Sequence, residues 1–70
     1  MTEEEILKLR HSGITRLTLA KIYQRRYNQN IEIIRLDMKN RNVRFITYKE
    51  SLNKIELILL KNIRKRWYYD

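Results

Sequence analysis

The chain of 70 residues has no cysteine and no proline, and Gly13 is its only glycine. Without cysteine there can be neither a disulfide framework nor a thiolate metal site, and one histidine cannot build a zinc site alone. No apolar run approaches the roughly 18 to 20 residues that cross a bilayer. The first ten residues are acidic where a secretory leader would be basic. We therefore expect an intracellular, cytoplasmic protein without a metal site or membrane association.

Side chains that could carry catalysis are also scarce. His11 is the only imidazole, and Ser12 and Ser51 have no evident base to activate them. The sequence has no glycine-rich phosphate loop, and so short a chain leaves little room for a pocket. We expect no enzymatic activity, no cofactor and no small-molecule substrate.

Positive charge is what the chain has in excess. Its 16 Lys and Arg outnumber 8 Asp and Glu, which gives a net charge of +8. The distribution is uneven, because three glutamates stand at 3–5, whereas residues 10–70 hold fifteen basic and five acidic side chains. Such a balance suits a polyanion partner, since each Lys or Arg that meets a phosphate releases condensed counterions. A soluble protein whose basic side chains only face water would have the same composition.

Helical patterns occupy both ends of what we expect to be one small basic domain, 1–70. Thr2 with Glu5 and Thr47 with Glu50 have the spacing of capping boxes, which mark helix starts. Gly13 is suited to end the first helix in a left-handed conformation. We predict a second helix over about 15–26. The last helix is predicted over about 48–67 from apolar residues at helical spacing: Leu52, Ile55, Leu59, Ile63 and Trp67.

The segment IEIIRLDMKNRNVRFITY, residues 31–48, is ambiguous. Three isoleucines in four residues and an asparagine-rich turn favour two strands. A hairpin turning at residues 40 and 41 matches three cross-strand pairs, namely Met38 with Val43, Leu36 with Phe45 and Asp37 with Arg44. A helix would leave Ile33 and Leu36 pointing away from the core. We therefore predict an α+β, winged-helix-like fold, with two N-terminal helices, a β-hairpin and a long C-terminal helix.

The stretch ILKLRHSGITRLTLAKIY, residues 6–23, resembles the front half of homeodomain-like helix-turn-helix domains. Bacterial and phage repressors, recombinases and terminase small subunits contain such domains. The resemblance implies duplex DNA as the partner, and in that family a small alanine lets the recognition helix cross closely. The matching residues are Ile6, Leu9 and Arg10, then Gly13 and Thr15 at the corner, then Leu19, Ala20, Lys21 and Tyr23.

The chain departs from this family directly after residue 23. A glycine and an apolar residue usually follow the second helix, and here these places hold Gln24 and Arg25. One possibility is a turn displaced to residues 27 and 28, with a recognition helix over 29–40 and VRFITY as part of a wing. The other is that the chain passes directly into the hairpin.

Candidate DNA contacts gather at the displaced turn and at the hairpin tip. Arginine can reach guanine, and asparagine or glutamine can pair with adenine, while a basic tip can follow the phosphate backbone or enter a minor groove. Clusters of this composition are also common in ordinary polar turns. The predicted contacts are Arg16, Lys21, Arg25, Arg26, Asn28, Gln29, Asn30, Lys39, Asn40, Arg41, Asn42 and Arg44.

The C-terminal KNIRKRWYYD interleaves basic and aromatic residues. Four of them could hold phosphate: Lys61, Arg64, Lys65 and Arg66. Alternatively, Trp67 packs on the core and the basic residues stabilise the negative end of the helix. Apolar residues beyond the core-facing stripe widen the apolar surface of this helix and predict contacts in a homodimer, namely Leu57, Ile58 and Leu60.

We interpret the chain as a DNA-binding protein. It would be a small regulator of transcription, recombination or replication of a phage or mobile element, and would bind duplex as a dimer over two half-sites. Two alternatives stay open. One is a protein-binding module, such as a phage-type inhibitor of a host nucleic-acid enzyme. The other is an RNA-binding protein whose aromatic side chains stack on unpaired bases, with Tyr23, Tyr27, Phe45 and Tyr48 as candidates.

Overall fold

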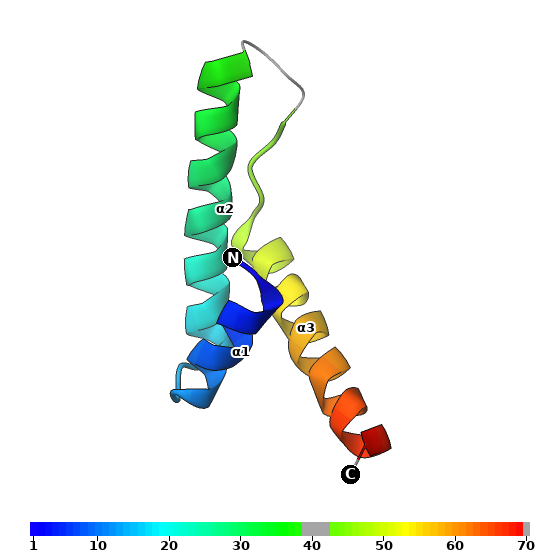
Figure 1. Ribbon diagram of the computed structural model, residues 1–70. Helices are drawn as coiled ribbons and strands as arrows, with labels where there is room; N and C mark the ends of the chain where they lie inside the picture. The colour runs from blue at the N-terminus through cyan, green and yellow to red at the C-terminus, as the bar shows by residue number, and fades with distance from the viewer. Residues whose placement is uncertain (39–42, 70) are drawn as a thin grey trace.

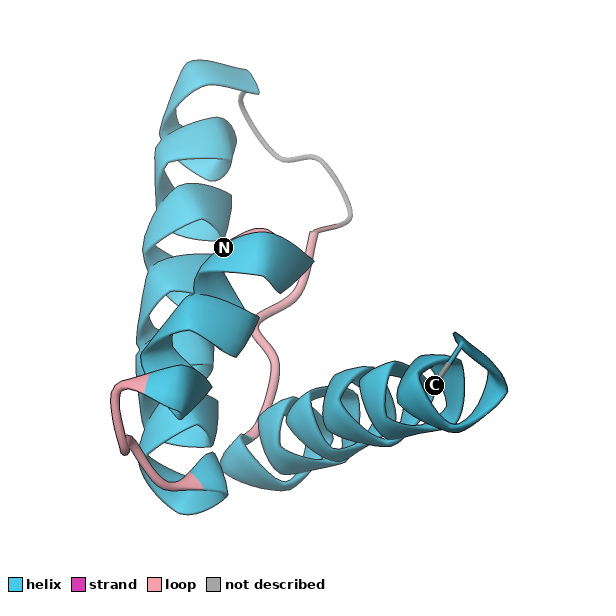
Figure 2. Ribbon diagram, turned by 60° about the horizontal axis from the view of Figure 1, so that its bottom comes forward, coloured by secondary structure: helices cyan, strands magenta, loops and turns pink. Residues whose placement is uncertain are grey.

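The described residues form three helices (Figure 1). A computed structural model describes residues 1–38 and 43–69, without the side chains of residues 38 and 64–69. The helices are α1 (Glu3–His11), α2 (Arg16–Met38) and α3 (Tyr48–Tyr69). α1 lies beside the N-terminal half of α2, and α3 begins near the middle of α2 and diverges from it (Figures 1 and 2). The C-terminal half of α2 therefore extends beyond the other two helices.

Local capping explains where α1 and α3 begin. The Glu5 N–H donates to Thr2 Oγ1 over 3.2 Å, and the Glu50 N–H donates to Thr47 Oγ1 over the same distance. Gly13 follows α1 with φ +94°, a left-handed conformation that costs glycine little. Both predicted caps, the left-handed glycine and the start of the last helix are confirmed.

A small core joins the three helices. α1 contributes Ile6, α2 contributes Leu19 and Ala20, and α3 contributes Ile55 and Ile58, all of them buried. Leu52 and Leu59 pack against this cluster, whereas Ile63 is about half exposed. The predicted stripe therefore faces the core at Leu52, Ile55 and Leu59, while Ile58 joins the core and Ile63 does not.

The predicted α+β, winged-helix-like fold is wrong. α2 continues without a break to Met38, so residues 27 and 28 form no turn and residues 31–38 form no strand. Adding one residue to an existing helix gains a hydrogen bond without a new nucleation cost, and nothing between 16 and 38 is proline or glycine. Ile33 and Leu36 then face solvent, as the helical alternative required. The predicted turn at 40 and 41 lies outside the described residues.

The segment 43–47 runs back along α2 without forming a strand ladder. Asn28 accepts from the Ile46 N–H over 2.9 Å and donates to the Ile46 carbonyl over 3.2 Å. The Arg35 guanidinium lies 5.4 Å from the centre of the Phe45 ring, an arrangement that favours a cation–π contact. Side chains of α2 therefore hold this segment where the hairpin would have used a second strand.

The molecule is extended for its mass. Its principal dimensions are 49 × 22 × 19 Å, and the Cα radius of gyration is 14.2 Å. A compact chain of this length would have a radius of about 11 Å. The accessible surface is 6098 Å² for 8.8 kDa, against about 4,800 Å² for a typical globular monomer. A large share of the surface is thus open to partners.

Candidate nucleic-acid interface

One exposed face of α2 carries basic and amide side chains at helical spacing. Lys21, Arg25 and Gln29 are separated by four residues each, so they stand one above another on the same side of the helix. All three are exposed, and they span about 12 Å along the helix axis. This α2 basic face points away from the core residues Leu19 and Ala20.

The other predicted arginines of the described residues have acidic partners. Arg16 lies 3.5 Å from Glu56, Arg26 lies 2.6 Å from Glu5, and Arg44 holds Glu50 with two hydrogen bonds of 3.0 and 2.8 Å. Within the described part of the chain, Lys21 and Arg25 form no ion pair. The α2 basic face is therefore one of the places where positive charge remains uncompensated. In the same part of the chain other cations also form no ion pair, namely Lys8, Arg10, Arg35, Lys49 and Lys54.

Two of these pairs shift the pKa values of their groups. The hydrogen bond from Arg26 holds the pKa of Glu5 below its ordinary value, and that from Arg44 does the same to the pKa of Glu50. The reciprocal hydrogen bond raises the pKa of Arg44. Glu5 and Glu50 are consequently ionised at neutral pH and remain partners of these arginines.

The residues predicted to form a DNA-reading turn separate onto different sides of α2. Asn28 is engaged by the backbone of Ile46, and Arg26 faces α1 through Glu5. Gln29 and Asn30 are exposed. Of the five side chains predicted at this turn, only Arg25 and Gln29 lie on the α2 basic face.

The structure describes only some of the other predicted contacts. The tip residues lie outside the described residues: Lys39, Asn40, Arg41 and Asn42. Residues 64–66 belong to α3, but their side chains also lie outside the description, so the phosphate contacts predicted for Arg64, Lys65 and Arg66 stay predictions. Lys61 is exposed and lies 3.9 Å from Glu3.

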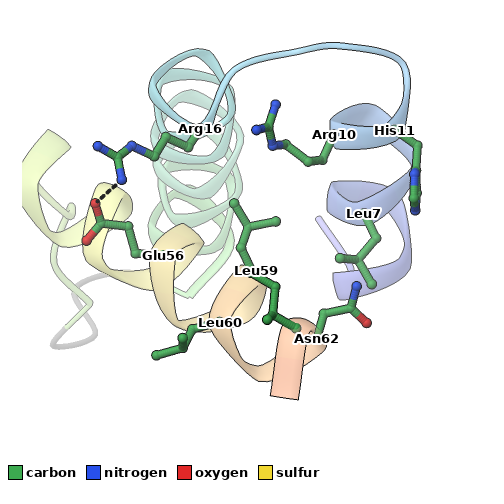
Figure 3. A pocket seen from close by; sticks show the side chains of 9 residues that line it. Leu7, Arg10, His11, Arg16, Glu56, Leu59, Leu60 and Asn62 are labelled. Carbon is green, nitrogen blue, oxygen red and sulfur yellow. Dashed lines mark ion pairs between the residues drawn. The ribbon is translucent and has the colours of Figure 1, made fainter. Parts of the chain in front are cut away.

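An open groove of about 520 Å³ between α1 and α3 was not predicted. Its apolar lining comes from Leu7 of α1 and from Leu59, Leu60 and Ile63 of α3. Figure 3 shows the groove with Arg10 and His11 on α1 and the Arg16–Glu56 pair on the opposite side. The sequence signal for this groove was the unusually wide apolar surface of α3, which exceeds what the core uses.

The three residues predicted as dimer contacts divide between core and surface. Ile58 is only 6% exposed and belongs to the core, which removes it from any surface available to a partner. Leu57 and Leu60 are 64% and 48% exposed. Only these two can meet another molecule without a change of fold.

Comparison with known proteins finds no match among family models, curated proteins or solved structures. The similarity to helix-turn-helix domains therefore stays a prediction from the residues quoted above. Among the described residues, no group of three or more histidine or acidic side chains is placed to hold a metal ion. In the same part of the chain, no helix combines the length and the apolar character needed to cross a bilayer.

Proposed function

We propose that the protein binds duplex DNA through the α2 basic face. The observation that carries this proposal is that Lys21 and Arg25 share one exposed helix face without an acidic partner among the described residues, whereas Arg16, Arg26 and Arg44 are paired with glutamates. The net charge of +8 adds long-range attraction for a polyanion. Within this proposal the protein is a small cytoplasmic DNA-binding regulator, acting in transcription, recombination or replication of a phage or mobile element.

The shape of α2 suits a major groove. A helix with its side chains is about 10–12 Å wide, and the major groove of B-DNA is about 12 Å wide. Lys21 and Arg25 would meet phosphates or guanine edges, and Gln29 would reach adenine. Glu32 lies on the same side one turn further along and would repel phosphate, so the contact would end near Gln29.

RNA binding by aromatic stacking receives less support from the side chains. Tyr23 and Tyr27 stack on each other with ring centroids 6.2 Å apart, and Arg35 covers Phe45. Tyr23 is half-buried, and this burial raises the pKa of its phenol. Aromatic faces that are already occupied offer little platform for an unpaired base.

The test is a titration of a fluorescent duplex of random sequence at about 50 and 200 mM salt, the range in which phosphate contacts cost orders of magnitude in affinity. The double variant Lys21→Ala, Arg25→Ala should bind more weakly at low salt. Its slope of log affinity against log salt should fall in magnitude by about two, one for each lost phosphate contact.

The matched control is Lys49→Ala, Lys54→Ala, which removes two exposed cations from α3. This control should keep the salt slope of the unmodified chain. Equal weakening by both double variants would show that charge alone attracts DNA and that α2 has no special part. A competing single-stranded RNA that displaces the duplex at equal concentration would move the assignment to RNA.

A further inference from the structure

We infer that two copies of this chain pair through α3, with Leu57 and Leu60 of each copy inserted into the α1/α3 groove of the other. The inference concerns a different surface from the α2 basic face and does not depend on DNA binding. It also replaces the predicted dimer contact at Ile58, which lies in the core.

The face of α3 is self-complementary in shape. Leu57 and Leu60 stand out from α3 as a ridge, because they are 64% and 48% exposed. The groove next to this ridge is lined by Leu7, Leu59 and Ile63, with Leu60 at its edge. A two-fold axis requires one patch to match itself, and a ridge beside a groove meets that requirement, since each ridge fills the other copy's groove.

The chain as a whole has enough surface for such a contact. It exposes about 1,300 Å² more than a globular monomer of its mass, part of it on the protruding C-terminal half of α2, while a standard interface removes about 800 Å² from each partner. α3 diverges from α2 and leaves its outer side uncovered (Figure 2). Pairing through α3 would bring the accessible surface of each chain closer to that of a globular monomer of its mass, without a change in the helices.

Charge around the face is compensated only in part, and each copy carries +8 overall. Arg16 and Glu56 line the groove and pair with each other, and Lys61, further along α3, pairs with Glu3. Arg10 donates to the neutral Ile14 carbonyl over 3.2 Å and keeps its charge, and Lys54 is exposed one turn before Leu57. Repulsion between charges is screened beyond about 8 Å at physiological salt. Pairing should therefore be stronger at physiological salt than at low salt.

The experiment is sedimentation equilibrium of the purified chain without DNA, from about 5 to 500 µM, a range that reveals micromolar and tighter pairing. The mass should rise from that of one chain, 8.8 kDa, toward twice that value. The variant Leu60→Glu should raise the dissociation constant at least about tenfold, because a carboxylate would have to enter an apolar groove.

The matched control is Leu36→Glu, the same substitution at a leucine of the far end of α2 that is 78% exposed. It should pair like the unmodified chain. Circular dichroism reports whether each variant stays helical, and Leu57→Lys replaces Leu60→Glu if the latter loses its helices. A single-chain mass at every concentration would overturn the inference and leave the face for a different protein. Pairing that survives Leu60→Glu or Leu57→Lys in a folded chain would overturn it too.

Discussion

At the scale of single residues, Ser51 is a polar group without a partner inside the core. Its side chain is fully buried, and its Oγ forms no hydrogen bond to any described residue. A buried hydroxyl that lacks a partner costs about 1–3 kcal/mol. Alanine at this position would remove the hydroxyl and also favours helix.

We therefore predict that Ser51→Ala raises the free energy of unfolding by about 1 kcal/mol. Urea denaturation followed by circular dichroism measures this change. Ser12→Ala is the matched control, because the Ser12 hydroxyl donates to the Lys8 carbonyl over 2.8 Å and its loss should not stabilise. A gain of the same size in both variants would contradict the role given to the buried hydroxyl.

Asn28 is the residue of α2 that forms two hydrogen bonds to the segment 43–47. Its amide both accepts from and donates to the Ile46 backbone, and Gln24 donates to the same carbonyl over 3.4 Å. Asn28→Ala would leave the Ile46 N–H without its side-chain acceptor. The unfolding free energy should fall by about 1–3 kcal/mol.

Amide hydrogen exchange tests this assignment directly, because the Ile46 amide should lose protection in Asn28→Ala before the amides of α1 do. Asn30→Ala is the control, since Asn30 is exposed on the same helix and should change stability by less than about 0.5 kcal/mol. Unchanged protection at Ile46 would mean that other contacts position the segment.

At the scale of elements, the helices that were predicted correctly have local signals. Thr2 and Thr47 accept hydrogen bonds from residues three positions later, so a short window of sequence contains the whole interaction. The extent of α2 has no such signal. Along its length α2 contacts residues far away in the sequence, Asn28 with Ile46 eighteen residues on and Arg35 with Phe45 ten residues on, and a short window that holds the isoleucines at 31–34 contains neither contact.

The candidate site, like the helices, could be predicted from the sequence only in part. Lys21, Arg25 and Gln29 were all among the predicted contacts, but the reason given was a turn, whereas they share one face of a continuous helix. Arg26 and Arg44 looked equivalent to them in the sequence. The partner of Arg26, Glu5, lies on α1, 21 residues away, so local composition cannot show this pairing, whereas Glu50 is only six residues from Arg44.

At the scale of the whole molecule, the two proposed surfaces use different helices. The α2 basic face is polar and lies away from the core, and the ridge and groove of α3 are apolar. A pair of chains joined through α3 would carry two copies of the α2 basic face. Such a pair could meet two half-sites on one duplex, which would strengthen binding through the high effective concentration of the second face.

The balance of charge also sets how the whole molecule responds to acid. Arg26 lowers the pKa of Glu5 and Arg44 lowers that of Glu50, so both pairs stabilise the fold fully above the ordinary glutamate pKa of about 4.3. That contribution disappears as the pH falls through their lower folded values. Protonating all eight acidic side chains would also leave sixteen Lys and Arg uncompensated around a small core.

The melting temperature should therefore fall between pH 5 and pH 3, by the linkage between proton binding and stability at roughly these values. Added salt should restore part of it by screening the repulsion among cations. Glu5→Gln should melt lower than the unmodified chain at pH 7 and lose less on acidification, because its pair with Arg26 is already missing. Thermal melts by circular dichroism at each pH measure both effects. If Glu5→Gln and the unmodified chain lost stability in parallel, the loss would come from general repulsion, and the pair that joins α1 to α2 would have no measurable part in it.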